Sequence, residues 1–184
     1  MRKLLLITGD LATGKSTFAN ILSMRYSENV FYKDTIKEIL GDTVGFSNRK
    51  ENLRLSKAAV ELMLLICSEF SNHDKNLILE ANFHQIELEK LRKIVSEKDY
   101  QVLTLVLRGD LHILHKRYLN RIYCENRHSV HLNMPLDDFD AFRDYIETAR
   151  KEDIVGDYIK INADDFSYQK DPLLLSKIDA FMKE

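Results

Sequence analysis

Residues 9–17 are the part of the chain whose residue types and spacing point most directly to chemistry. They match the pattern G-x-x-x-x-G-K-[ST] and consist of Gly9, Asp10, Leu11, Ala12, Thr13, Gly14, Lys15, Ser16 and Thr17. Glycine at both ends lets the backbone curl around an anion without a Cβ clash. The loop N–H groups and the start of the following helix then offer positive potential to a phosphate. We therefore predict that residues 9–17 bind a nucleotide.

Two side chains of this loop have chemistry of their own. Lys15 is a mobile positive charge that can reach the β- and γ-phosphates, and the Ser16 hydroxyl is a suitable Mg²⁺ ligand. A GTPase would need an N/T-K-x-D segment to read guanine, and the sequence has none. A ring ATPase usually carries Asp-Glu after an apolar run, where this chain has Glu80-Ala81-Asn82. The loop therefore predicts ATP and Mg²⁺ as cofactors, with a small molecule as phosphoryl acceptor.

Short apolar runs alternate with longer helical stretches, and together they must position this loop. The pattern predicts strands at residues 4–7, 30–32, 77–79, 102–107 and 158–161. It predicts helices at residues 15–26, 34–40, 48–72, 85–96, 111–124, 138–151 and 173–183. Strands separated by helices indicate an α/β fold with a parallel sheet and helices on both faces. Ligands bind such sheets at the carboxyl ends of the strands, so the residues after each strand matter most.

Composition and charge restrict the classes of protein further. With 45% hydrophobic and 30% charged residues, the 184 residues are expected to form a single domain, 1–184. Lys and Arg total 27 against 29 Asp and Glu, and a net charge of -2 argues against a mainly electrostatic nucleic-acid binder. The apolar run at 4–7 is too short for a signal peptide, and that at 62–67 is too short to cross a membrane. Two cysteines without a C-x-x-C pair are typical of reduced thiols, so we expect a cytoplasmic protein without a membrane partner.

The phosphate loop in this strand–loop–helix setting resembles that of the P-loop small-molecule kinases. This group includes nucleoside-monophosphate kinases and AAA-type P-loop kinases related to chloramphenicol phosphotransferase, zeta-toxin and polynucleotide kinase. The resemblance is specific at the loop and extends over most of the chain. It implies a three-layer P-loop NTPase fold, with a five-stranded parallel sheet in the order 2-3-1-4-5 and a short arginine-bearing lid at about residues 117–136.

Carboxylates and an amide follow two of the predicted strands. Asp34 comes after the second strand, where the resemblance implies a catalytic base or orienting group for the acceptor hydroxyl. The alternative is that Asp34 only caps the helix that follows. Glu80 follows the third strand and is expected either to hold a Mg²⁺-bound water or to contact the acceptor. Asn82 is expected to face the acceptor, or else to cap the next helix.

Arginines in the lid segment are candidates for contacts with the nucleotide. Phosphoryl transfer benefits from a guanidinium that arrives when the site closes, because charge spreads over the transferring oxygens. The resemblance implies that Arg127 reaches the phosphates and that Arg121 lies against the base. The alternative is that these side chains pair with Glu125 or are simply solvated. Arg54, near the start of the helix at 48–72, would suit a phosphorylated or carboxylated acceptor, or else a solvated helix end.

These residues predict an ATP- and Mg²⁺-dependent kinase with Lys15, Asp34 and Arg127 in the catalytic roles. The acceptor would be a small molecule bearing a hydroxyl or a phosphate. One alternative is a polynucleotide kinase or a toxin-type nucleotide-sugar kinase. A second is an ATP-binding switch or interaction module with little transferase activity, in which Asp34 would not face an open acceptor pocket.

Overall fold

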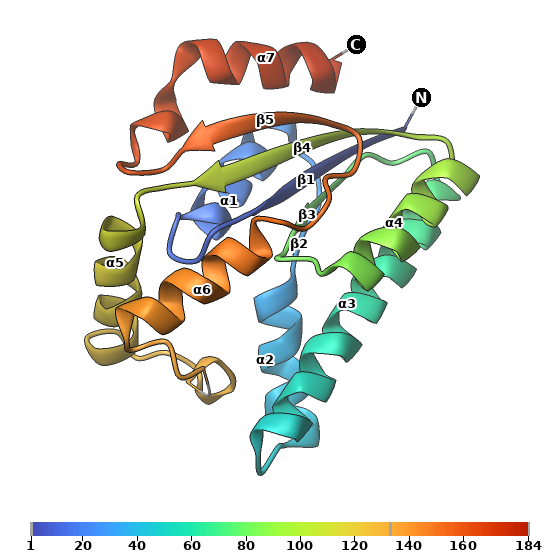
Figure 1. Cartoon of the computed structure of the whole chain (residues 1–184). Coiled ribbons are helices and arrows are strands. Elements are labelled where there is room, and N and C mark those ends of the chain that lie inside the picture. The colour runs from blue at the N-terminus through green and yellow to red at the C-terminus, as the bar shows by residue number, and fades with distance from the viewer. Residues whose placement is uncertain (1, 133, 184) are drawn as a thin grey trace.

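A parallel sheet forms the centre of the molecule in the computed structural model, which describes residues 2–132 and 134–183. Its strands are β1 (Arg2–Gly9), β2 (Val30–Tyr32), β3 (Leu77–Glu80), β4 (Tyr100–Arg108) and β5 (Asp157–Asn162). They are hydrogen-bonded in the order β2-β3-β1-β4-β5 (Figure 1). Each neighbouring pair is parallel, with Leu4 opposite both Leu77 and Val102. The predicted sheet and its strand order are therefore confirmed.

Seven helices and two short 3-10 turns accompany the strands among the described residues. The helices are α1 (Lys15–Tyr26), α2 (Lys33–Val44), α3 (Arg49–Ser71), α4 (Gln85–Glu97), α5 (Leu111–Tyr123), α6 (Phe139–Ala149) and α7 (Pro172–Lys183). The 3-10 turns are η1 (Ser129–His131) and η2 (Ser167–Lys170). No helix in this part of the chain combines the length and the apolar character that crossing a bilayer requires.

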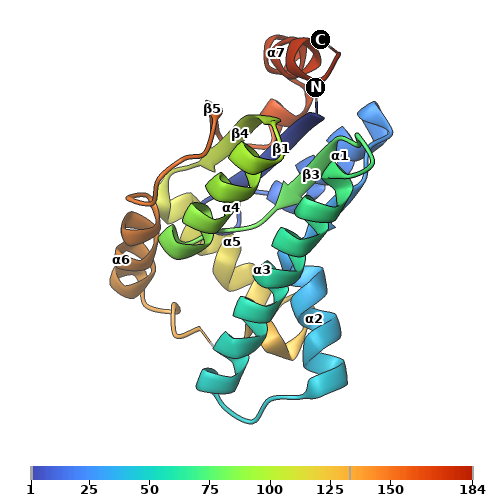
Figure 2. The ribbon, with the colours of Figure 1, turned by 90° about the vertical axis from the view of Figure 1, so that its right-hand side faces the viewer.

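The central strands β1 and β3 are buried on both faces, as a continuous apolar strand requires. In β1, Leu4 and Leu6 pack against α3 and α4, whereas Leu5 and Ile7 pack against α1 and α7. Successive side chains of a strand point to opposite faces, so a single run of four apolar residues serves two cores. The result is three layers, with α3 and α4 on one face and α1 and α7 on the other (Figures 1 and 2).

Two pairs of helices frame the phosphate loop. Helices α5 and α6 pack together around Phe142 in a third apolar cluster, which Ala12 of the phosphate loop joins. Helices α2 and α3 lie side by side and extend away from the sheet (Figures 1 and 2). The carboxyl ends of the central strands therefore lie between the pair α2 and α3 and the pair α5 and α6 (Figures 1 and 2).

Helix α2 is longer than the sequence predicted, running to Val44 instead of Leu40. Gly41 follows the predicted end, and glycine is a poor helix former. A Cβ on Gly41 would lie 2.4 Å from the Val130 side chain. Glycine is therefore needed inside this helix so that η1 can pack closely on it, and tertiary packing outweighs local propensity.

Candidate active site

The phosphate loop connects the end of β1 to the start of α1 through two glycines in the left-handed region. Gly9 has φ 126° and Gly14 has φ 84°. A Cβ on Gly9 would lie 2.0 Å from the Leu107 carbonyl oxygen, and one on Gly14 would lie 2.9 Å from the Phe166 ring. Strand β4 and the segment after β5 thus pack directly on the loop, and both positions require glycine.

Lys15 lies inside this loop with 9% of its surface exposed. Its Nζ donates to the carbonyl oxygen of Asp10 at 2.6 Å and to that of Gly9 at 3.2 Å. Burial lowers the pKa of Lys15, while the charges of Glu80 and Asp34 oppose this shift. The ammonium is therefore held by backbone oxygens at the place where the predicted triphosphate would supply a stronger, negatively charged partner.

Ser16 and Glu80 meet beside Lys15, although 64 residues separate them in the sequence. The Ser16 hydroxyl donates to Glu80 Oε2 at 3.0 Å, and Glu80 is only 5% exposed at the end of β3. Burial raises the pKa of Glu80, and the Lys15 charge and the Ser16 hydrogen bond oppose this. A hydroxyl and a carboxylate are hard oxygen ligands of the kind Mg²⁺ prefers. This donor pair therefore fits the metal that the sequence predicts.

Asp34 lies in the first turn of α2 with 53% of its side chain exposed. The Arg127 Nη2 atom is 3.8 Å from Asp34 Oδ2, and His131 Nδ1 is 4.0 Å from the same oxygen. Tyr32, and not Asp34, occupies the N-cap position of α2, and its side chain makes no capping hydrogen bond. The capping alternative for Asp34 is thus excluded. The structure instead brings Asp34 to a lid arginine.

The lid segment predicted at 117–136 comprises the end of α5, η1 and their connections, and its Asn133 lies outside the described residues. Its central part is docked on α2. His131 Nε2 lies 2.7 Å from Glu38 Oε1, and His128 Nε2 lies 2.9 Å from Asp42 Oδ1. This docking places Arg127, 17% exposed, against Asp34.

Lys37 and Asn52 complete the docking, and neither was predicted from the sequence. Lys37 Nζ donates to Asn52 Oδ1 at 2.8 Å and to the Val130 carbonyl oxygen at 3.0 Å. Asn52 Nδ2 donates to the same carbonyl at 2.9 Å. Burial and the nearby Lys33 charge lower the pKa of Lys37 to about 8. One signal was available, since Lys37 follows Asp34 by three residues and therefore shares its helix face.

One cavity of about 1170 Å³ joins these groups. Lys15, Ser16, Asp34, Glu80 and Arg127 all line it. Its other walls come from α3, α4, α5 and the segment after β5. Pockets for a single small ligand are commonly about 300–1,000 Å³, so this cavity has room for two small ligands side by side.

The two arginines of α5 occupy different parts of this cavity. Arg121 is close enough to lower the pKa of Lys15, and it lies 3.8 Å from Glu125. Arg117 lies with its guanidinium carbon 4.3 Å from the centre of the Phe166 ring and donates to the Ala163 carbonyl oxygen at 2.7 Å. Arg121, predicted to lie against the base, thus places its charge next to the phosphate loop, while Arg117 is the arginine stacked on a ring.

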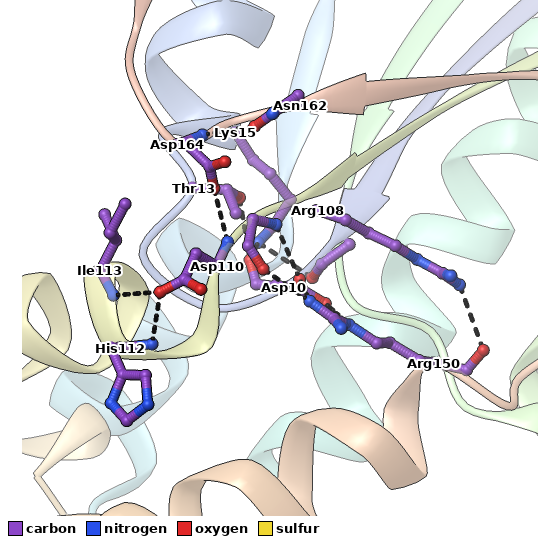
Figure 3. A network of polar contacts seen from close by, with 12 residues as sticks. Asp10, Thr13, Lys15, Arg108, Asp110, His112, Ile113, Arg150, Asn162 and Asp164 are labelled. Atoms are coloured by element: carbon purple, nitrogen blue, oxygen red, sulfur yellow. Dashed lines mark hydrogen bonds and ion pairs between the residues drawn. The ribbon is translucent and has the colours of Figure 1, made fainter.

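Three of the predicted site residues, Gly9, Asp10 and Arg54, do not line the cavity. The Asp10 side chain is 3% exposed and turns away from the cavity to pair with Arg150, so only its backbone belongs to the phosphate loop (Figure 3). Gly9 likewise shapes the loop without lining the cavity. Arg54, predicted to bind the acceptor, is exposed and does not line the cavity, whereas Asn52 and Leu53 do. The helical rotation between adjacent positions carries Arg54 away from the site.

Asn82 lies at the edge of the cavity after β3. Its Oδ1 atom is buried and has no hydrogen-bond partner among the described residues. His84, not Asn82, caps α4, because Glu87 accepts a hydrogen bond from the His84 N–H at 2.8 Å in a capping box. A buried amide oxygen without a donor costs free energy, which a donor brought by a ligand in the adjoining cavity would recover.

Comparison with known proteins agrees with this architecture. A family model described as an AAA domain (AAA_18) matches residues 5–141. No curated protein matches the sequence. Among solved structures, a candidate kinase from Chloroflexus aurantiacus superposes with a TM-score of 0.84 at 22% identity, covering 98% of each chain.

Two further solved structures are similar at lower identity. The tunicamycin resistance protein of Deinococcus radiodurans has a TM-score of 0.63 at 18% identity, covering 98% of this chain and 95% of that one. A shikimate kinase from Bacteroides thetaiotaomicron has a TM-score of 0.59 at 15% identity, covering 99% of each chain. At these identities the likeness is one of fold.

Proposed function

The chain belongs to the AAA domain family AAA_18, whose P-loop kinase fold it has, and on this basis we propose that it is an ATP- and Mg²⁺-dependent kinase. It would transfer the γ-phosphoryl group to a small hydroxyl- or phosphate-bearing acceptor. Residues 1–184 would act as one kinase domain, with 117–136 as its lid. The neighbouring kinase structures support phosphoryl transfer as the reaction class and leave the acceptor open.

One observation carries the proposal. A phosphate loop with a buried lysine, a hydroxyl–carboxylate pair suited to Mg²⁺, and the Asp34–Arg127 pair all face one cavity. Transfer from ATP needs charge neutralisation at the phosphates, a group that accepts the proton of the attacking hydroxyl, and a cation at the transferring oxygens. Each of these needs has a residue on the cavity wall.

The residues divide the reaction as follows. The acceptor oxygen attacks the γ-phosphorus, the bond from that phosphorus to the bridging oxygen breaks, and ADP leaves with the electron pair. Asp34 takes the hydroxyl proton at its carboxylate. Lys15 and Arg121 neutralise the phosphates, and Arg127 stabilises the charge on the transferring group. Ser16 and Glu80 would hold Mg²⁺, which, when bound, neutralises the β- and γ-phosphate oxygens.

The place of Asp34 favours a transferase over an ATP-binding switch. A switch has no need for a carboxylate in an acceptor chamber, yet Asp34 lines the cavity that also contains Lys15. Its lid partner Arg127 is already 3.8 Å away.

An acceptor screen tests the proposal. The purified protein is given γ-labelled ATP and Mg²⁺ with panels of nucleosides, sugars, antibiotics, small acids and 5′-hydroxyl oligonucleotides. We expect a labelled product with a small molecule, reduced at least about 100-fold in Asp34→Asn. Asp140→Asn, which changes an exposed aspartate in the first turn of α6, is the matched control and should retain activity. Equal product from Asp34→Asn and wild type would refute the role of Asp34, and a labelled oligonucleotide would replace the small-molecule acceptor.

A further inference from the structure

The part of the cavity wall that α2, α3 and α4 form is rich in positive charge. Helices α2, α3 and α4 contribute five basic side chains to it, Lys33, Lys37, Arg49, Lys57 and Lys90. The same helices contribute three acidic side chains, Asp34, Glu61 and Glu87. In a chain whose net charge is -2, this wall has a local excess of the opposite sign.

The acids on this wall are already engaged. Glu61 pairs with Lys90, and Glu87 accepts a hydrogen bond from the His84 backbone in the capping box of α4. Asp34 faces Arg127 and His131 of the lid. Among the described acids that line this wall, only Glu61 forms an ion pair with one of its five basic side chains, so positive charge remains in excess there.

Lys37 is a buried ammonium on this wall whose hydrogen-bond partners in the described part of the chain are all neutral. Only 8% of it is exposed, and its ammonium donates to two neutral oxygens, those of Asn52 and Val130. An ammonium has three N–H donors, so one remains for a ligand in the cavity that Lys37 lines. Burial and the charges of Lys33, Arg127 and Arg49 lower its pKa, and Asp34 opposes them. A buried charge held only by neutral groups costs free energy that an anion would recover.

Asn82 gives a second requirement for the ligand. Its buried Oδ1 has no donor among the described residues, as reported above. A hydroxyl group can supply that donor, and a carboxylate or a phosphate dianion cannot. The cavity therefore has complementary features for a molecule with a negative group at one place and a hydroxyl group at another.

We propose that the acceptor carries a negatively charged phosphate or carboxylate group in addition to the hydroxyl that is phosphorylated. Lys37 and Lys57 would hold this group. That the bound anion is the phosphoryl acceptor rests on the proposed kinase function. The anion site itself rests only on the side chains of α2 and α3 that line the cavity. Lys57 lies on that wall as an exposed lysine, with no ion pair to the described residues.

Simple anions test the site without knowledge of the full acceptor. The intact protein is saturated with Mg²⁺ and a non-hydrolysable ATP analogue, so that the phosphate loop is occupied. Methyl phosphate, acetate and glycerol are then titrated by calorimetry. We expect one of the two anions to bind at least about tenfold more tightly than glycerol. A preference for methyl phosphate identifies a phosphorylated acceptor, and a preference for acetate identifies a carboxylated one.

Lysine variants locate the binding. Lys57→Gln should weaken the preferred anion at least about threefold, and Lys37→Gln by more, whereas Lys177→Gln on exposed α7 should change nothing. Because Lys37 also docks the lid, Lys57→Gln keeps the test valid if Lys37→Gln folds poorly. The site is overturned if neither anion binds better than glycerol, or if Lys57→Gln and Lys177→Gln behave alike. Anion binding without any phosphoryl transfer would overturn the kinase function but support the anion site. Phosphoryl transfer to neutral alcohols alone would support the kinase function but overturn the anion site.

Discussion

Asp10 and Arg150 form an ion pair in which Arg150 Nη2 lies 2.6 Å from Asp10 Oδ2, across 140 residues of sequence (Figure 3). The same Arg150 nitrogen donates to the Gly109 carbonyl oxygen at 2.8 Å, and the Gly109 N–H donates to Asp10 at 3.2 Å. The hydrogen bond with Asp10 raises the pKa of Arg150. The phosphate loop, the end of β4 and the end of α6 are thus joined through one carboxylate.

This pair gives a prediction about stability. Arg150→Met would leave the buried Asp10 carboxylate without its cation, so we expect the free energy of unfolding to fall by about 2–4 kcal/mol. Asp10→Asn combined with Arg150→Met should recover most of that loss, because neither charge then remains unpaired. Urea unfolding of the two single variants and the double variant measures the coupling. Strictly additive losses would show that the pair contributes nothing of its own.

The strands and the phosphate loop could be predicted from the sequence, but the pairing of Asp10 with Arg150 could not. Alternating apolar runs and helical stretches predicted all five strands and α1 at its exact bounds, because burial and periodicity are local signals. The loop pattern pointed to Lys15 and Ser16, and both line the cavity. The partner of Asp10 depends on where α6 ends relative to β4, and no local signal in the sequence carries that distance.

Glu80 provides a prediction about the metal. Glu80→Gln keeps the shape of the side chain but removes the negative charge beside Ser16, so the Mg²⁺ concentration for half-maximal activity should rise at least about tenfold. Glu147→Gln on the exposed surface of α6 serves as control. Titration of activity with Mg²⁺ measures the effect. An unchanged Mg²⁺ dependence would place the metal on other groups.

Arg127 provides a prediction about the transition state. Arg127→Met should lower kcat by about 10²–10³-fold with a smaller change in the KM for ATP, because the guanidinium acts on charge that develops during transfer. Arg143→Met, on the solvent side of α6, is the control. Steady-state kinetics separate the two constants. A rise in KM with unchanged kcat would instead assign Arg127 to ground-state binding.

Lys37 provides a prediction about pH. Its pKa of about 8 in the ligand-free protein means that its positive charge is lost as pH rises through that value. Lys33, Arg49 and Arg127 disfavour the charge and Asp34 favours it. Binding of an anion such as acetate should therefore weaken above pH 8, by up to about tenfold per unit. Lys37→Gln should abolish this dependence, and calorimetry at pH 7, 8 and 9 measures it.

The same shift affects the stability of the ligand-free protein with a definite sign. Between pH 8 and the ordinary pKa of lysine, the unfolded chain holds a proton on Lys37 that the folded chain has released. The contribution of Lys37 to the free energy of unfolding therefore rises with pH in this window. It is lowest below pH 8, where both states carry the charge and the folded state must bury it.

The acceptor wall shows why part of the site could not be read from sequence. Arg54 was predicted there, but Asn52, Leu53 and Lys57 line the cavity instead. The rotation of α3 about its axis follows from how its apolar face packs on the sheet, and an error of one residue turns a side chain by about 100°. Lys37 was missed because its acceptor oxygens come from α3 and η1, far away in the sequence.

The central claim is that this phosphate loop serves phosphoryl transfer, and Lys15→Ala tests it most directly. Wild type and variant are compared for formation of ADP from ATP with Mg²⁺ and the acceptor that the screen identifies, with thermal unfolding as a control for folding. We predict a folded variant whose turnover falls by at least about 10³-fold, because the positive charge of Lys15 no longer neutralises the β- and γ-phosphates. A folded Lys15→Ala protein that consumes ATP at the wild-type rate would contradict it.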